Sequence, residues 1–440
     1  MKVLVIGSGG REHAILWALK RTSSVALDLY CAPGNGGISQ IAECVAIAAS
    51  DQSSLIEFVR ANAIDLTIVG PEGPLAEGIV DVFESSGLMI MGPSRAASRL
   101  ESSKAFAKDF MRRHLIPTAD YCIVNSAAEA LELLSSGRFG STANAVVVKA
   151  DGLAAGKGVI VAPSRIAAEN AVAELTSGAL VSPDAVHQIL IEEALQGPEV
   201  SVLLFADGRD YALMPPARDH KRIGENDTGP NTGGMGAITD GSVLNKETLD
   251  RIVREVVEPT LKGAAEEGFP FRGILFIGLM LTAQGPKVLE YNVRFGDPET
   301  QAILIRLESD LFHVFQAIIQ GELRKISLKW SPRSSACVVL ASQGYPGSYQ
   351  SGIPIKGLGG FPSSDDLQVF HAGTSKSEGG NFITSGGRVL GITAADATLD
   401  QALQNCYGAI ERIAWQGMQY RRDIGQFKES GKAGSSESNV

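Results

Sequence analysis

The chain has 440 residues, of which 44% are hydrophobic and 20% charged, a composition typical of a globular protein with room for two to four domains. Its formal net charge of −10 argues against nucleic acid as the main partner, because a phosphate backbone is bound by a basic surface. The five cysteines are scattered, so we expect neither structural zinc nor a disulfide framework, which fits a reducing cytoplasm. No apolar run has the length of a signal peptide or a membrane span, so we expect no membrane partner.

Residues 1 to about 100 alternate short apolar strands with glycine-rich loops and helical spacing. This pattern predicts an α/β domain with a parallel sheet, whose loops share one edge where ligands bind. The first loop, IGSGGREH, is similar to a dinucleotide-binding turn, but Glu12 stands where a third glycine is needed and no acidic residue ends the second strand at Cys31. The loop therefore favours a small phosphorylated ligand at the helix N-terminus, aided by Arg11, over a nicotinamide-dependent oxidoreductase. A purely structural tight turn stays open as the alternative.

The next stretch predicts a compact lid. Residues 145–149 and 159–162 are apolar strands joined by the glycine-rich run 150–158, which predicts a hairpin that can close over a ligand. The run is not a Walker loop, because its spacing from Gly152 is one residue short and a strand follows where a helix should. Its backbone N–H groups and Lys157 could still cover phosphates.

Charged residues close to this lid suit a nucleotide site. Lys149 ends an apolar strand, where an unpaired ammonium would be costly to bury, so we expect an anionic partner. The alternative is a solvated lysine at a strand end. Glu192 and Glu193 follow another apolar strand and are either an ordinary charged turn or part of a nucleotide site. In the second case the backbone pairs with an adenine edge and Glu199 accepts hydrogen bonds from ribose hydroxyls.

The polar run 218–237 contains little that builds a core. A loop this long and this poor in apolar residues is usually functional or disordered. Its glycines, with Asn231 and Thr232, predict a shaped loop of backbone donors, and Lys221 with its arginine neighbours makes a patch that attracts anions. His220 taken alone is more often a surface or capping residue than a catalyst.

Residues 274–292 predict a hairpin that turns near Gly285. Successive side chains of a strand point to opposite faces. The second strand should therefore direct Leu289, Tyr291 and Val293 toward the core.

The opposite face of that strand is the most informative feature of the sequence. Glu290, Asn292 and Arg294 project to this side. A carboxylate and an amide oxygen beside a guanidinium form an oxygen-rich metal site next to an anion clamp, which suits Mg-nucleotide phosphates. The alternative is a half-buried strand with a solvated polar face.

From about residue 331 the sequence becomes β-rich. A helix is predicted to begin at Thr398, where Thr398 and Gln401 match a capping box. The polar tail 428–440 is expected to be disordered.

Several segments, taken together and in this order, resemble the phosphoribosylamine–glycine ligase (glycinamide ribonucleotide synthetase) family of the ATP-grasp superfamily. The segments that carry the resemblance are VLVIGSGGREHA, APGNGG, VGPEGPL, VVVKADGLAAGKGV, DHKR, TGPNTGGMGA, KVLEYNVRFGDPETQ, FHAGT and TSGGRVLG, and they span nearly the whole chain. The resemblance implies an α/β and α+β multidomain fold. Its parts would be a Rossmann-like N-terminal substrate domain (1–101), a two-lobed ATP-grasp unit (102–328, with a lid at about 120–190) and a small β-rich C-terminal domain (329–427).

The resemblance also implies an activity. It is the ATP-dependent joining of glycine to 5-phosphoribosylamine through glycyl phosphate, which yields glycinamide ribonucleotide, ADP and phosphate in purine biosynthesis. ATP and Mg²⁺ or Mn²⁺ would be the cofactors. A cytoplasmic monomer acting on small molecules is expected.

Residue roles carried over from the family fall into four groups. The metal ligands would be Glu290 and Asn292. ATP would be bound by Lys104, Lys149, Gly156, Lys157, Glu192, Glu193, Leu195 and Glu199. The substrates would be held by Gly10, Arg11, Glu12, Asn35, Gly36, Glu72, Asp219, His220, Lys221, Asn231, Thr232, Gly233, Gly234 and Arg294. Catalytic roles would fall to Arg294, Asp219 and Lys157.

A departure at the metal site and two further rival interpretations accompany the resemblance. Related ATP-grasp enzymes often carry a metal carboxylate on the neighbouring strand, which here reads LFIGLML and has no acid. A biotin-type carboxylase is the nearest competitor, but it would be expected to lack the DHKR and TGPNTGGMGA segments. A catalytically silent nucleotide-binding protein is disfavoured by the intact polar face at 290–294.

Overall fold

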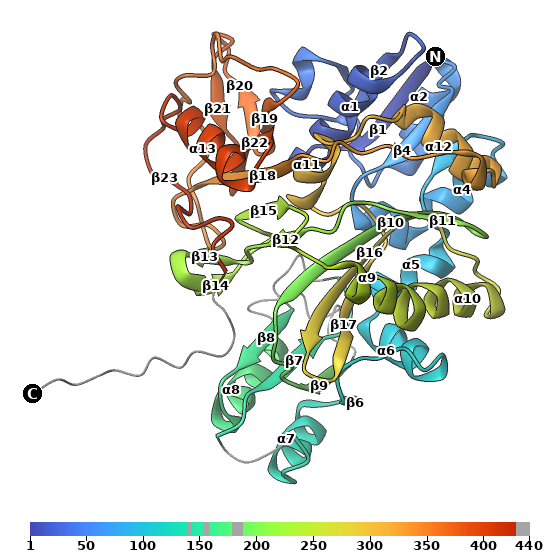
Figure 1. Ribbon diagram of the computed structural model, residues 1–440, viewed down its shortest axis with the longest axis vertical. Helices are drawn as coiled ribbons and strands as arrows, with labels where there is room; N and C mark the ends of the chain where they lie inside the picture. Colours follow the sequence, from blue (N-terminus) through green and yellow to red (C-terminus); the bar gives the residue numbers. More distant parts are fainter. Residues whose placement is uncertain (140–142, 154–157, 178–187, 428–440) are drawn as a thin grey trace, which may run out of the picture.

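The structure is a computed structural model that describes residues 1–139, 143–153, 158–177 and 188–427. Figure 1 shows a lid lobe at one end of the molecule, with the N-terminal and C-terminal parts side by side at the other. Among the described residues, no helix combines the length and the apolar character needed to cross a membrane.

The N-terminal part is a five-stranded parallel sheet in the order β3-β2-β1-β4-β5. Its strands are β1 Lys2–Gly7, β2 Asp28–Pro33, β3 Glu43–Cys44, β4 Leu66–Val69 and β5 Ile90–Met91. The connecting helices are α1 Gly10–Thr22, η1 Ile38–Gln40, α2 Gln52–Ala61, α3 Glu72–Glu77 and α4 Ile79–Ser85. Residues Val3 to Ile6 of β1 are fully buried, because the central strand of a parallel sheet is covered on both faces. The α/β prediction for this region is confirmed.

The lid lobe is a four-stranded antiparallel sheet in the order β6-β9-β7-β8. Helices α5 Arg95–Ser102 and α6 Lys104–Arg113 precede it. The lobe consists of β6 Tyr121–Val124, α7 Ala127–Ser135, β7 Val146–Ala150, β8 Val159–Ala162, α8 Arg165–Thr176 and β9 Ile189–Glu193. β7 and β8 pair as the predicted hairpin, and the lobe has a separate small core around Val148.

The second lobe of the central part is a four-stranded sheet in the order β11-β10-β16-β17. Its strands are β10 Glu199–Asp207, β11 Tyr211–Leu213, β16 Arg272–Thr282 and β17 Gly285–Asn292. Helices α9 Lys246–Ile252, the π-turn η4 Val253–Val257, α10 Glu258–Glu266, α11 Glu299–Leu304, α12 Leu311–Gln320 and η5 Leu323–Lys325 belong to the same region. β16 and β17 form the predicted hairpin, closed at Thr282 and Gly285.

The prediction that Leu289 faces the core is wrong, because β17 contains a bulge. The register passes from Leu279 opposite Val288 directly to Gly278 opposite Glu290, so Leu289 is the extra residue. Val288 and Tyr291 lie in the core instead, and Leu289 is only half-buried.

Two large cores run through both the N-terminal sheet and the β10–β16 sheet. One contains Leu4 and Ile6 together with Val202 and Leu279, and the other contains Val3 together with Phe205. The N-terminal sheet and the β10–β16 sheet therefore share their cores, although the expected domain boundary lies at residue 101. The lid has a core of its own.

The C-terminal sheet has the order β12-β15-β18-β22-β19, with β23 also paired to β18. Its strands are β12 Arg218–Asp219, β15 Gly236–Thr239, β18 Ser334–Ser342, β19 Leu367–His371, β22 Arg388–Asp396 and β23 Met418–Gln419. Two small ribbons complete it, namely β13 Arg222–Gly224 with β14 Thr228–Asn231, connected through η3 Glu225–Asp227, and β20 Thr374–Lys376 with β21 Phe382–Thr384. Helix α13 Leu399–Ile410 begins after Thr398, whose side chain accepts a hydrogen bond from the Gln401 N–H, so the predicted cap is confirmed.

The polar run 218–237 differs from the expected loop. Four short strands, β12 to β15, lie in it or begin within it, and β12 and β15 form one edge of the C-terminal sheet. β13 and β14 pair with each other, whereas β15 pairs with β12 and with β18, which comes about a hundred residues later. The edge formed by β12 and β15 therefore depends on tertiary pairing and not on a local apolar pattern. The tail 428–440 lies outside the described residues.

Candidate active site

The predicted polar face lies at the end of β17. Glu290 stands opposite Gly278 of β16, where a Cβ would come within 3.3 Å of the Glu290 Cγ. The Asn292 Oδ1 accepts a hydrogen bond of 3.1 Å from the Arg294 Nη2. All three side chains are half-buried, whereas Tyr291 is buried in the core. The strand therefore places Glu290, Asn292 and Arg294 together at one site, as predicted.

Three lysines from separate elements surround the Glu290 carboxylate. Burial alone would raise the pKa of Glu290, but Lys221, Lys149 and Lys104, helped by Arg294, hold this pKa below its ordinary value. Lys104 opens α6, Lys149 lies in the lid strand β7, and Lys221 follows β12. An ionised carboxylate among converging cations is a suitable environment for a polyphosphate with a divalent ion.

The Arg294 guanidinium is held by two carboxylates. Its Nε lies 3.2 Å from Glu72 Oε2, and its Nη2 lies 2.9 Å from Glu101 Oε1. Burial lowers the pKa of Arg294, but Glu101 and Glu72 raise it above the ordinary value, so the cation is permanent. Glu101 also accepts a 2.7 Å hydrogen bond from the Val293 N–H. Glu72 was predicted from the sequence, whereas Glu101 was missed because it looks like an ordinary helix surface residue.

The anionic partner expected for Lys149 is Glu192. The Lys149 Nζ lies 3.0 Å from Glu192 Oε2, and Lys108, which sequence reasoning missed, lies 2.9 Å from the same oxygen. Burial lowers the pKa of Lys108 to about 8, and the neighbouring Lys149 cation contributes. The other oxygen of Glu192, Oε1, is buried without a hydrogen-bond partner. Such an acceptor is available to a ligand donor.

The other predicted ATP residues lie around the junction of β9 and β10. The Glu193 Oε1 lies 2.8 Å from the Lys287 Nζ, and the Glu199 Oε2 lies 2.8 Å from the Lys221 Nζ. Leu195 is half-buried in the loop between the two strands. Gly156 and Lys157 lie outside the described residues.

Two further carboxyl groups face the same charges. Burial, together with Glu199 and Glu290, raises the pKa of Asp219 to about 6, against the opposing effect of Lys221. Glu299, at the start of α11, is only 4% exposed. Burial and the Asp219 charge raise its pKa to about 8. Glu299 was not predicted, because an acidic residue in the first turn of a helix has an ordinary structural explanation.

Some of the predicted substrate residues of the N-terminal part are engaged in contacts within the protein. The Arg11 Nε donates to Glu12 Oε1 at 2.7 Å, and its Nη1 donates to the Phe295 carbonyl at 3.1 Å. Glu12 is 1% exposed and fills the space beside two glycines, Gly7 and Gly70. Gly10 begins α1.

The Asn35 side chain joins the N-terminal and C-terminal parts. Its Nδ2 donates to the carbonyls of Ser8 and His371, each at 2.8 Å, and its Oδ1 accepts from two N–H groups of the next turn. The following residue, Gly36, donates its N–H to the Thr374 carbonyl. Both residues therefore hold β2 against the C-terminal sheet.

The predicted glycine loop after β14 is organised by local hydrogen bonds. The Thr232 Oγ1 donates to the Lys221 carbonyl at 2.8 Å and accepts from the Gly234 N–H at 3.0 Å. Gly233 donates its N–H to the Tyr345 hydroxyl, and the preceding Asn231 pairs with Arg222 across β13 and β14. This loop therefore lies against the C-terminal sheet.

His220 is a buried packing residue. It is 1% exposed, stacks on Phe427 with ring centroids 4.3 Å apart, and accepts a hydrogen bond from the Gly425 N–H. Burial, assisted by the nearby Arg421 charge, lowers the pKa of His220 to about 4. Of the two ordinary positions expected for this residue, surface or capping, the surface position is wrong, because the side chain is buried.

The donor set at the end of β17 suits a hard divalent cation. Across the described ranges, no group of three or more His, Cys, Asp or Glu side chains is arranged to hold a metal. Glu290 supplies an ionised carboxylate and Asn292 an amide oxygen that is also bonded to Arg294. Mg²⁺ is commonly held by one or two carboxylates and by substrate phosphates, so these two residues fit such an ion.

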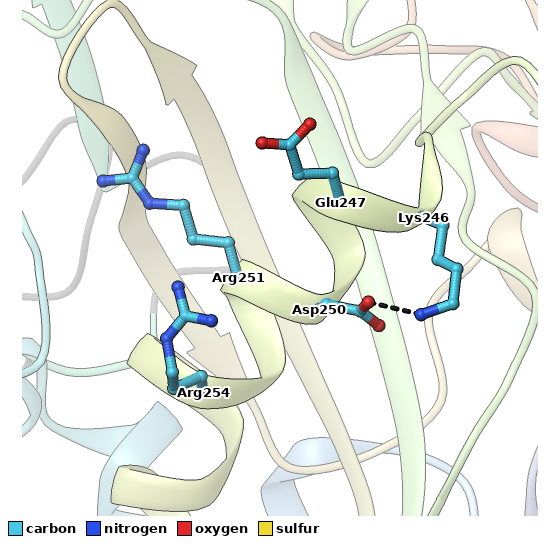
Figure 2. Close-up of a pocket in the computed structure, with 5 residues that line it drawn as sticks. All are labelled: Lys246, Glu247, Asp250, Arg251 and Arg254. Carbon is cyan, nitrogen blue, oxygen red and sulfur yellow. Dashed lines mark hydrogen bonds and ion pairs between the residues drawn. The ribbon is translucent and has the colours of Figure 1, made fainter.

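Two hollows of the surface lie away from this site. Figure 2 shows the first, of about 510 Å³, on the outer face of α9, where Lys246 and Asp250 pair with each other. The second, of about 300 Å³, lies between β11 and α10 beside Tyr211 and Leu261. Neither hollow is lined by a predicted site residue, and the charged side chains in Figure 2 come from α9 and the adjoining η4.

Comparison with known proteins agrees with this arrangement. Three families, described as the N domain, the ATP-grasp (A) domain and the C domain of phosphoribosylglycinamide synthetase, match residues 1–101, 102–300 and 335–427. The chain belongs to the phosphoribosylglycinamide synthetase family.

Relatives of this family match along almost the whole chain. A phosphoribosylamine–glycine ligase of Vibrio cholerae is 47% identical over 428 residues, covering 97% of this chain and 98% of its own. One of Brucella melitensis is 46% identical over 425 residues, covering 97% of both chains. These identities make the present chain an ATP-grasp ligase.

The similar solved structures include one from the same family and one that shares only the fold. A phosphoribosylamine–glycine ligase from Thermotoga maritima superposes with a TM-score of 0.81 at 31% identity, covering 96% of this chain and all of its own. A biotin carboxylase from Campylobacter jejuni superposes with a TM-score of 0.71 at 15% identity, covering 95% of this chain and 92% of its own. The second likeness concerns the fold alone, whereas the three family matches and the relatives of 46–47% identity assign the chain to the phosphoribosylglycinamide synthetase family.

Proposed function

We propose that this chain joins glycine to 5-phosphoribosylamine, with cleavage of ATP to ADP and phosphate, and so makes glycinamide ribonucleotide for purine biosynthesis. The observation that carries the proposal is the ionised Glu290 beside Asn292, surrounded by Lys104, Lys149 and Lys221, in a member of this family. The setting would be the cytoplasm, the partners would be small molecules and not nucleic acid, and the active form would be a monomer.

The chemistry explains why these residue types are needed. The glycine carboxylate does not react with amines, because oxide would have to leave. Transfer of the ATP γ-phosphoryl group to this carboxylate gives glycyl phosphate and ADP. The ribosylamine nitrogen then attacks the acyl carbon, an amide forms, the nitrogen loses a proton and phosphate leaves. Phosphoryl transfer depends on positioning and charge neutralisation, which agrees with a site of cations and carboxylates.

The proposed nucleotide site joins the lid to the central sheet. Lys104, Lys149 and the loop of Gly156 and Lys157 would neutralise and cover the phosphates. Adenosine would be seated by Glu192, Glu193, Leu195 and Glu199. Glu290 and Asn292 would hold Mg²⁺ or Mn²⁺, which when bound neutralises phosphate charge and orients the γ-phosphoryl group.

The substrate side would be formed mainly by Arg294 and by Asp219 of β12. Asp219 and Arg294 would position glycine and the acyl phosphate, because one attracts the ammonium and the other the carboxylate. The further residues proposed for the substrates are Gly10, Arg11, Glu12, Asn35, Gly36, Glu72, His220, Lys221, Asn231, Thr232, Gly233 and Gly234. For Glu12, Asn35 and His220, whose side chains are bonded within the protein, the proposed role is to hold the walls of the site.

The test is release of ADP from MgATP with each substrate omitted in turn. ADP should form only when glycine and freshly prepared phosphoribosylamine are both present, and the product should be glycinamide ribonucleotide by mass spectrometry. Replacing glycine with bicarbonate tests the carboxylase alternative that the shared fold raises. ADP release with bicarbonate and none with glycine would reject the proposal.

A further inference from the structure

We propose that Arg388 of the C-terminal sheet is a positioning residue for the reaction, because it holds together the two glycine-containing loops that border the site. These loops are defined here as the 232–235 loop, between β14 and β15, and the 294–298 loop, which follows β17. The inference rests on the proposed function for its kinetic consequence, whereas its structural consequence can be measured independently.

The Arg388 side chain bonds to both loops. Its Nη1 donates to the Gly233 carbonyl at 2.7 Å and also to the Asp297 carbonyl. The same nitrogen lies 3.6 Å from the Asp297 carboxylate. The Arg388 guanidinium therefore binds two backbone carbonyls and lies near one carboxylate. These contacts fix the two loops relative to each other.

The loops themselves fit closely where Arg388 joins them. Gly234 has a φ of +114°, and a Cβ on this residue would come within 2.5 Å of the Pro298 Cδ. A Cβ on Gly233 would come within 3.0 Å of the Arg388 Cζ. The absence of both side chains lets the guanidinium and the proline ring approach the loop backbone.

The 294–298 loop is held from two sides by arginines. Arg11, from the N-terminal α1, donates to the Phe295 carbonyl at 3.1 Å, while Arg388, from the C-terminal sheet, donates to the Asp297 carbonyl. Arg294 lies at the start of this loop and faces Glu72 and Glu101. Release of one end would let the Arg294 backbone shift, and a shift on the order of 1 Å can cost about a hundredfold in rate.

The backbone of Arg388 is fixed independently of its side chain. The Arg388 carbonyl accepts from the Gly373 N–H at 2.9 Å, and the preceding Gly387 carbonyl accepts from the Ser342 N–H at 2.8 Å. β22 also pairs with β18 along its length. Truncation of the side chain should therefore remove the hold on the loops and leave the sheet intact.

The experiment compares Arg388→Met, Arg388→Lys and a matched control, Arg333→Ala, in the full chain. Arg333 is another C-terminal arginine, whose ion pair with Asp366 does not touch either loop. Hydrogen–deuterium exchange should be faster by roughly tenfold in both loops of Arg388→Met and unchanged in the control. Unchanged exchange in both loops would overturn the inference.

Steady-state kinetics with glycine, phosphoribosylamine and MgATP provide the second measurement. Arg388→Met should lower kcat by about tenfold or more and leave the KM for ATP within about twofold. Arg388→Lys should recover part of kcat, because one ammonium can donate to both carbonyls. A raised KM for phosphoribosylamine with an unchanged kcat would instead make Arg388 a substrate ligand and overturn the positioning role. If the unmodified chain showed no glycine-dependent turnover, the proposed function would fail, while the exchange result would still decide the loop contact.

Discussion

At the scale of single residues, the site consists of charged side chains from distant segments of the chain, and the opposite charges neutralise one another. Glu290 is ionised because lysines from α6, β7 and the β12–β13 connection approach it, and Arg294 is balanced by Glu72 and Glu101. Removing one charge therefore leaves its neighbours unbalanced, which costs more than the loss of a surface pair.

Replacing Glu290 with glutamine keeps the shape of the side chain and removes its charge. Glycine-dependent ADP release should fall by more than about 100-fold, because the metal loses its only carboxylate ligand in the proposed site and loss of an outer-shell partner alone costs about 10- to 100-fold. Mn²⁺ binding in the presence of ATP, followed by electron paramagnetic resonance, should weaken in parallel. The exposed Glu308 provides the control in Glu308→Gln, which should behave as the parent. Near-parental turnover of Glu290→Gln would refute the metal role.

Sequence reasoning was most successful for residues whose pattern is local. Alternation along β17 identified Glu290, Asn292 and Arg294, which the structure does bring together. Glu101, Lys108 and Glu299 were missed because each looks like an ordinary helix residue, and their relevance depends on partners far along the chain. Pairing of this kind is not encoded in periodicity.

At the scale of elements, the pairing of neighbouring strands determines which way their side chains point. The hairpin of β16 and β17 followed from its apolar runs and Gly285, but the bulge at Leu289 did not. A bulge is a mismatch between two strands, so one strand's alternation cannot reveal it. The strands β12 and β15 were missed for a related reason, because β12 pairs with β15 and β15 pairs with the distant β18.

Gly234→Ala tests the close fit of the loops. Its positive φ and the Pro298 ring should make the alanine destabilising by about 1–3 kcal/mol in urea unfolding. Gly241→Ala is the matched control, because a Cβ there meets nothing within 4 Å, and it should leave the free energy of unfolding unchanged. Equal stabilities for the two variants would show that the loop relaxes freely.

At the scale of the whole molecule, buried histidines lie where the C-terminal part meets the rest. The His371 N–H donates to the His13 Nδ1 at 2.9 Å, and His220 stacks on Phe427. Burial, followed by the His371 charge, lowers the pKa of His13 to about 3, and burial lowers the pKa of His371 to about 4.

These histidines predict loss of stability in acid. Each is neutral when folded, whereas the unfolded chain binds protons below about pH 6.5, so stability is present above that pH and is lost as the pH falls toward 3–4. The slope should be at most about 1.4 kcal/mol per pH unit for each histidine. His13→Asn keeps an acceptor for the His371 N–H without titrating, so its unfolding free energy should depend less steeply on pH. His313→Asn, at an exposed position, should retain the parental slope, and the same slope for both variants would contradict this account.

The C-terminal sheet combines strands from distant parts of the chain, and this affects how the protein folds during synthesis. β15 bonds to β12 and β18, and β18 bonds in turn to β22, which ends at Asp396. During synthesis, the segment 218–239 must leave the ribosome long before its partner strands exist. This segment therefore waits as an open edge, which chaperones can shield, until the last quarter of the polypeptide emerges. Translation that stops near residue 330 would thus yield a product that contains Glu290, Asn292 and Arg294 but lacks the strand that pairs with β15, and a gene divided there would need both fragments in the same cell for complementation.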